Sequence, residues 1–140
     1  MDLATIKNLG NFCIDDLKDS MKEIFEFQKK FDRMRGWDWS SPANEEERMR
    51  FLQHGTIALA GEVGEFANIL KKAMRHYEST GELPNSETYE GLKEELVDVF
   101  IYVVKISLAL GLDLAEGYYD KMKINDKKFA KYVKDKSSEK

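Results

Sequence analysis

The sequence contains few of the residues that crosslink a chain or interrupt helices. It has 1 cysteine, Cys13, and 2 prolines among 140 residues. A single cysteine excludes an internal disulfide framework and a cysteine-based zinc cluster. The scarcity of proline, together with abundant Lys, Glu and Leu, favours an all-α fold.

Long apolar runs are also missing. The longest one covers residues 99–104 and is far shorter than the ~20 apolar residues that cross a membrane. The N-terminus lacks the basic-then-apolar pattern of a signal peptide. We therefore expect a cytoplasmic protein that does not associate with membranes.

The charge is unevenly distributed along the chain. The net charge is -4, yet residues 121–140 hold eight Lys against three acidic residues. A surface that binds duplex nucleic acid should be basic along one face, and the acidic remainder of the chain offers none. We expect no nucleic-acid partner, a single helical domain over residues 1–133 and a frayed basic tail over residues 134–140.

Apolar periodicity predicts four helices, at about residues 14–31, 43–76, 87–110 and 113–133. Ser40 or Ser41 is the expected cap of the second helix. The glycines within that helix, at 55, 61 and 64, suggest close helix approach, a local break near Gly55 or room for a ligand. The predicted fold is a bundle of four to five helices around two long antiparallel helices. Because the third helix is apolar on nearly every face, we also expect a homo-oligomer whose interface covers it.

Acidic residues form a polar stripe on each of the two central helices. At 100° per residue, Glu62 and Glu65 share one face of the second helix, and Glu95 and Asp98 share one face of the third. In an antiparallel hairpin the two pairs come level. Four facing carboxylates repel one another unless a cation lies between them, and oxygen ligands select Mg²⁺ or Mn²⁺.

Several of these residues stand in motifs that resemble the all-α nucleoside triphosphate pyrophosphohydrolases of the MazG type. The motifs are Leu-Ala-Gly-Glu-Val-Gly-Glu at 59–65, Glu-Glu-Leu-Val-Asp at 94–98, and a Lys, Asn, Lys pattern at 121, 125 and 128. Arg-Gly-Trp-Asp-Trp at 35–39 resembles the dCTP pyrophosphatase branch of that family.

The resemblance implies a helical homodimer or homotetramer that hydrolyses a nucleoside triphosphate to the monophosphate and pyrophosphate. The substrate would be dCTP or a modified dNTP, and the role would be house-cleaning of the nucleotide pool. It also implies that Mg²⁺ is bound by Glu62, Glu65, Glu95 and Asp98. Related activities, those of a dimeric dUTPase or a phosphoribosyl-ATP pyrophosphohydrolase, stay open, as does a non-catalytic helical partner protein.

Within this hypothesis the remaining polar and aromatic residues receive roles. We expect Glu65, in preference to Glu62, to activate the attacking water. Phosphate contacts are expected from Lys72, Lys121, Asn125 and Lys128, and base contacts from Trp37, Trp39, His54 and Tyr102.

The two tryptophans pose a problem of distance. They precede the long helix, about 28 Å from Glu62 if that helix is straight. To reach the base, either the helix breaks near Gly55 or the loop serves a neighbouring subunit. Alternatively, the two rings only pack at an interface.

Overall fold

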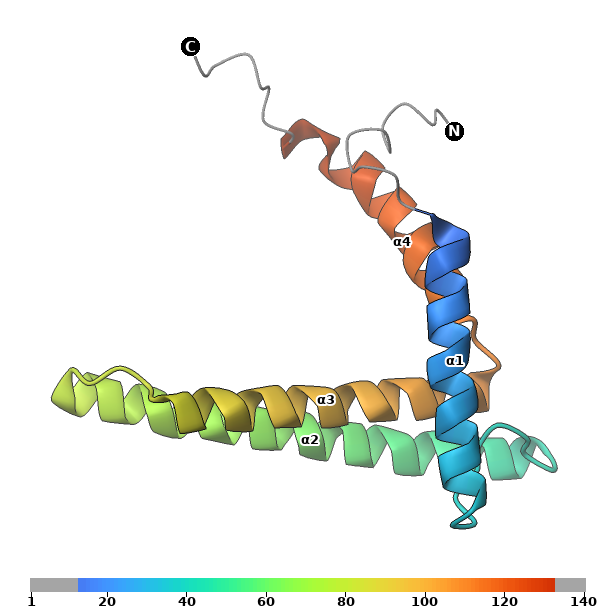
Figure 1. Ribbon diagram of the computed structural model, residues 1–140, viewed down its shortest axis with the longest axis horizontal. Helices are drawn as coiled ribbons and strands as arrows, with labels where there is room; N and C mark the ends of the chain where they lie inside the picture. Colours follow the sequence, from blue (N-terminus) through green and yellow to red (C-terminus); the bar gives the residue numbers. More distant parts are fainter. Residues whose placement is uncertain (1–12, 133–140) are drawn as a thin grey trace. The chain divides into compact units, whose positions relative to one another are not determined.

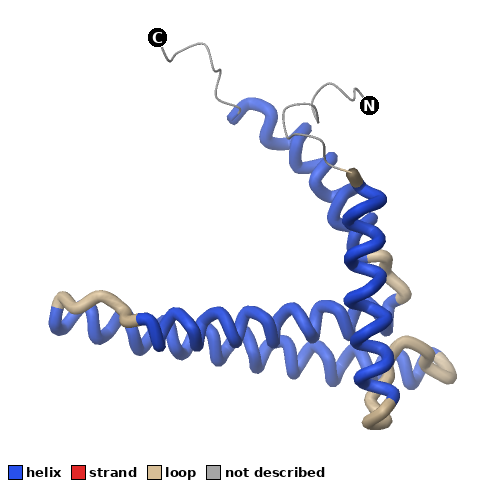
Figure 2. The backbone as a smooth tube through the Cα atoms, viewed as in Figure 1, coloured by secondary structure: helices blue, strands red, loops and turns tan. Residues whose placement is uncertain are grey.

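A computed structural model describes residues 13–132, and all of their regular structure is helical (Figures 1 and 2). The helices are α1 (Ile14–Arg33), α2 (Glu45–Thr80), α3 (Ser86–Leu110) and α4 (Leu114–Phe129), followed by the short 3₁₀ helix η2 (Ala130–Tyr132). The predicted all-α class is thereby confirmed. No helix in this part of the chain has the length and apolar content required to cross a membrane.

The chain divides into two compact units, each with its own contacts. One contains the start of α1, up to Ile24, together with α4. There Lys18 pairs with Glu116 at 3.3 Å and with Asp113 at 3.6 Å, so the N-terminal half of α1 is joined to the start of α4. The other unit is Phe25–Leu112, which holds the end of α1 and all of α2 and α3.

The helix ends follow the local chemistry of capping. Asn44, Asn85 and Asp113 are the N-caps of α2, α3 and α4, and each side chain accepts a backbone N–H in the first turn of its helix. Gly81 and Gly111 end α2 and α3 in the left-handed conformation. The predicted caps Ser40 and Ser41 are therefore wrong for α2, because Asn44 starts the helix later.

The helices α2 and α3 form a long antiparallel hairpin and lie side by side in Figure 1. Their connection covers only residues 81–85, since α2 continues four residues beyond the predicted end at His76. The predicted pair of long antiparallel helices is thus present.

Of the alternatives for Gly55, a local break is absent, because α2 runs unbroken from Glu45 to Thr80. The close approach of a neighbouring helix is present there. A Cβ atom there would lie 2.8 Å from Cγ1 of Ile106 and 2.9 Å from the ring of Trp39. Because glycine has no side chain, Trp39 of the loop and Ile106 of α3 can pack against α2 at this position.

Candidate metal centre

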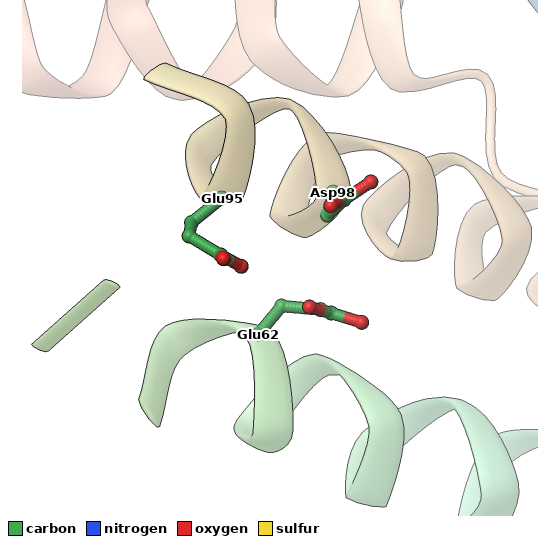
Figure 3. A group of neighbouring side chains, drawn as sticks. All are labelled: Glu62, Glu95 and Asp98. Carbon is green, nitrogen blue, oxygen red and sulfur yellow. The ribbon is translucent and has the colours of Figure 1, made fainter. Parts of the chain in front are cut away.

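Three acidic side chains meet across the α2–α3 hairpin. Glu62 on α2 and Glu95 and Asp98 on α3 point toward one another (Figure 3). One carboxylate oxygen of each lies within 4.8 Å of those of the other two, and all three residues are half-buried. We call Glu62, Glu95 and Asp98 the carboxylate cluster. It contains three of the four residues that the sequence predicted to come level.

The fourth predicted ligand, Glu65, lies outside the carboxylate cluster. It is exposed and follows Glu62 by one helical turn. The negative charge of Glu65 nevertheless affects Glu95 in the cluster. Desolvation raises the pKa of Glu95 above its ordinary value, and the neighbouring carboxylates of Glu62, Asp98 and Glu65 raise it further. Glu65 therefore borders the cluster electrostatically without belonging to it.

The donor set fits a small hard cation. The cluster offers only carboxylate oxygens, which are ligands that Mg²⁺ and Mn²⁺ accept. In an octahedral Mg²⁺ site with oxygens at about 2.1 Å, neighbouring ligand oxygens lie about 3 Å apart. The three carboxylate oxygens, now within 4.8 Å of one another, would therefore move closer together on binding an ion. The three carboxylates also repel one another, and a divalent ion would relieve that repulsion.

Predicted phosphate and base residues of the hairpin lie on opposite sides of the cluster. Lys72 is exposed and lies toward the hairpin tip, seven residues beyond Glu65. Tyr102 is half-buried and lies in the other direction, one turn beyond Asp98. His54, which is exposed, precedes the cluster on α2 and so lies on the same side as Tyr102.

The loop of residues 34–44 folds back onto the start of the hairpin through Trp39. Its ring stacks with Phe51 at 5.9 Å between centroids and touches the backbone of α2 at Gly55. Lys105 Nζ lies 4.4 Å from the centre of the same ring. Trp39 is half-buried in these contacts, so this ring packs within its own chain.

Trp37, in contrast, presents its ring to the outside. It is 55% exposed, and within residues 13–132 no ring contact of Trp37 is found. Its backbone is fixed, because its N–H donates to the carbonyl of Asp32 at 2.9 Å. Trp37 thus offers an exposed aromatic surface on an anchored turn.

Asp38, between the two tryptophans, orders this turn. It accepts the N–H of Ser40 at 2.8 Å and pairs with Arg33 at 2.6 Å. Partial burial raises the pKa of Asp38, but the bonds to Ser40 and Arg33 lower it by more, so the net pKa is below its ordinary value.

An ion pair that the sequence analysis missed lies beneath the loop. Lys105 Nζ is 3.4 Å from Oδ1 of Asp32, and their side chains are only 10% and 3% exposed. The signal was present in the sequence, since Asp32 follows Phe25 by seven residues and so occupies an inward position of α1. A charged residue at such a position needs a buried partner.

The other predicted phosphate residues lie on α4, in the unit that does not contain the cluster. They are Lys121 and Lys128, both exposed, and Asn125, which is half-buried. Lys128 lies 5.2 Å from the ring centre of its neighbour Phe129. The predicted tail, residues 134–140, lies outside the described residues.

Comparisons with models of protein families, with curated proteins and with solved structures find no match.

Proposed function

We propose that this protein is a Mg²⁺-dependent nucleotide pyrophosphohydrolase that converts a nucleoside triphosphate to the monophosphate and pyrophosphate. The observation that carries the proposal is the carboxylate cluster. Three acidic side chains from two helices face one another within 4.8 Å, an arrangement that is unfavourable without a cation. The motifs that supply them are those that resemble the MazG-type enzymes.

Within this proposal the acidic residues have separate tasks. Glu62, Glu95 and Asp98 hold Mg²⁺ or Mn²⁺, which when bound polarises the phosphoryl oxygens. Glu65 remains outside this donor set and is exposed. Its carboxylate is therefore available to orient a water molecule and accept its proton.

The order of residues along the hairpin supports one direction for the substrate. Lys72 lies on the tip side of the cluster, whereas Tyr102 lies on the side of loop 34–44. A cation suits the polyphosphate end, and aromatic side chains suit a base. The nucleotide would thus place its base near Tyr102, with Trp37 and His54 as further contacts, and its terminal phosphate toward Lys72. Lys121, Asn125 and Lys128 of α4 belong to the other unit, and their role as phosphate contacts stays a prediction from the sequence.

A homodimer or homotetramer is part of the same proposal. Several large apolar side chains on the hairpin are exposed in the single chain, including Ile57 at 66%, Leu96 at 59% and Val97 at 58%. Within the described residues the buried apolar side chains are only Val104, Ala109 and Ala115. Association between copies would remove this apolar surface from water.

A substrate panel tests the proposed function. Purified protein is incubated with Mg²⁺ and each of dCTP, modified dCTP, dUTP and phosphoribosyl-ATP, and pyrophosphate and the nucleoside monophosphate are quantified. We expect pyrophosphate from a dNTP and none with EDTA. A preference for dUTP or phosphoribosyl-ATP would assign the protein to one of those activities, and no turnover of any nucleotide would favour a non-catalytic partner protein.

A further inference from the structure

Asp32, at the end of α1, connects the hairpin to loop 34–44. Its side chain accepts hydrogen bonds from Lys105 at 3.4 Å and from Gln28 at 3.1 Å. Its backbone carbonyl accepts the N–H groups of Arg35 at 3.0 Å and Trp37 at 2.9 Å. One buried residue thus holds α3 through its carboxylate and the first turn of the loop through its carbonyl.

Lys105 completes the connection from the side of α3. Its ammonium pairs with Asp32 and also lies against the ring of Trp39. The end of α1, the loop and α3 therefore meet at a single buried cation. Because both charges are almost fully removed from water, separating Asp32 from Lys105 is strongly disfavoured.

The position of this connection relates it to the carboxylate cluster. Lys105 follows Asp98 by seven residues on α3, and Gly55, against which Trp39 packs, precedes Glu62 by seven residues on α2. Both separations correspond to two helical turns, about 10 Å. The loop is thus anchored at the same level on both helices, on the Tyr102 side of the cluster.

An apolar pair would stabilise the fold at least as well as this ion pair. Replacement of buried ion pairs by apolar residues of similar size is often neutral or stabilising. An apolar pair, however, does not require one particular orientation of its side chains. A carboxylate and an ammonium that also contacts an aromatic ring select one arrangement of the loop, whereas apolar contacts tolerate several.

We propose that Asp32 and Lys105 are positioning residues that hold loop 34–44 in the one arrangement that presents the exposed ring of Trp37 to the base of the substrate. This inference rests on the proposed function, since it names residues that act on the base subsite. Neither residue touches the substrate. They act through Trp37, by way of the Asp32 carbonyl and the Trp39 ring.

The test uses the double variant Asp32→Leu/Lys105→Met, which replaces the charges with apolar groups of similar size. The matched control is Glu90→Leu/Lys93→Met, which removes an exposed ion pair from α3. We expect the Asp32/Lys105 double variant to raise the KM for the preferred nucleotide about tenfold, the effect of losing one base-stacking contact. Its kcat and its inhibition constant for inorganic tripolyphosphate, which has no base, should stay within about twofold of wild type.

A double-mutant cycle identifies the route of the effect. Trp37→Ala alone should raise the KM by a similar factor, and adding it to Asp32→Leu/Lys105→Met should raise the KM no further. Additive effects would show that the buried pair does not act through Trp37. A folded double variant with wild-type KM would overturn the proposal outright.

A second measurement does not depend on activity. The backbone N–H of Trp37 is protected by the carbonyl of Asp32, so its hydrogen exchange, followed by NMR, should be at least tenfold faster in the Asp32/Lys105 double variant. Unchanged exchange would overturn the positioning role even if no nucleotide is hydrolysed. If exchange is faster in the double variant but wild type hydrolyses no nucleotide, Asp32 and Lys105 still order the loop. In that case the loop is not ordered to contact a nucleotide base.

Discussion

The unit Phe25–Leu112 contains two groups of partly or fully buried charges, and they are built in opposite ways. In the carboxylate cluster, three half-buried groups of the same sign face one another across α2 and α3. Beneath loop 34–44, Asp32 and Lys105 are more deeply buried but have opposite signs and pair directly. The pair is complete within the chain, whereas the cluster could hold a cation from outside. This difference separates a structural ion pair from the proposed ligand site.

Removing one carboxylate of the cluster should abolish nucleotide hydrolysis and leave the protein folded. We expect Glu95→Gln or Asp98→Asn to lower the rate of pyrophosphate release about a thousandfold or more, because a metal ligand is lost. The structure should persist, since each substitution also relieves repulsion. Glu94→Gln, which changes an exposed neighbour of Glu95, is the control and should retain activity. Wild-type rates in either cluster variant would exclude the assigned site.

Removing one charge of the buried pair should have the opposite outcome. Lys105→Met leaves Asp32 buried without its cation and should lower the free energy of unfolding by about 3–5 kcal/mol. Adding Asp32→Leu should restore most of the stability. Urea denaturation followed by circular dichroism measures both values. A single variant as stable as wild type would show that the pair is not structurally important.

The sequence predicted these two groups with unequal success. The pattern of acidic residues on α2 and α3 identified all three members of the cluster, because helical periodicity and a short hairpin connection fix which residues face each other. It also added Glu65, which lies outside the cluster. Asp32 was missed because its partner is 73 positions away, and only packing of α1 against α3 brings the two together. The helix start at Asn44 was also misassigned, since several capping residues lie within residues 40–44.

The same limit applies to the loop. The sequence identified Trp37 and Trp39 as candidates for the base but gave no means of distinguishing them. The structure does so, because Trp39 packs against Phe51, Gly55 and Lys105, whereas Trp37 remains exposed. The sequence also left a break and a close approach open at Gly55, and the structure shows a close approach of Trp39 and Ile106.

Divalent metal should stabilise the cluster and leave the buried pair unaffected. At a Mg²⁺ or Mn²⁺ concentration a hundred times the Kd, we expect about 2.7 kcal/mol of added stability and a higher Tm. Asp98→Asn should abolish most of the increase, and Lys105→Met should retain it. Calorimetry with and without EDTA provides the measurement. An equal metal response in the Asp98 variant would argue for binding elsewhere.

Two glycines of α2 differ in how closely other residues pack against them. Gly55→Ala places a Cβ atom 2.8 Å from Ile106 and 2.9 Å from Trp39, so we expect a loss of about 1–3 kcal/mol. Gly64→Ala meets nothing within 4 Å and should gain up to about 1 kcal/mol from helix propensity. Thermal unfolding of the two variants should therefore shift in opposite directions. A gain at Gly55 would contradict the close packing of Trp39 on α2.

The smallest expected effect is a pH dependence from Glu95. Its pKa is raised in the folded protein, so between the unfolded and folded pKa values the folded state binds more protons. The stability of the metal-free protein should therefore fall as the pH rises through that window and level off above it. Tm measured against pH in EDTA, for wild type and Glu95→Gln, isolates this contribution. A wild-type profile that rises through the same window relative to the variant would contradict the raised pKa.

In the proposed function, Glu62, Glu95 and Asp98 form one cation site across the α2–α3 hairpin. Titration of the metal-free protein with Mn²⁺, followed by electron paramagnetic resonance of the free ion, tests it most directly. We predict saturable binding in wild type and in Glu94→Gln, and a loss of affinity of at least tenfold in Glu62→Gln, Glu95→Gln and Asp98→Asn alike. Unchanged Mn²⁺ affinity in all three cluster variants would contradict the account.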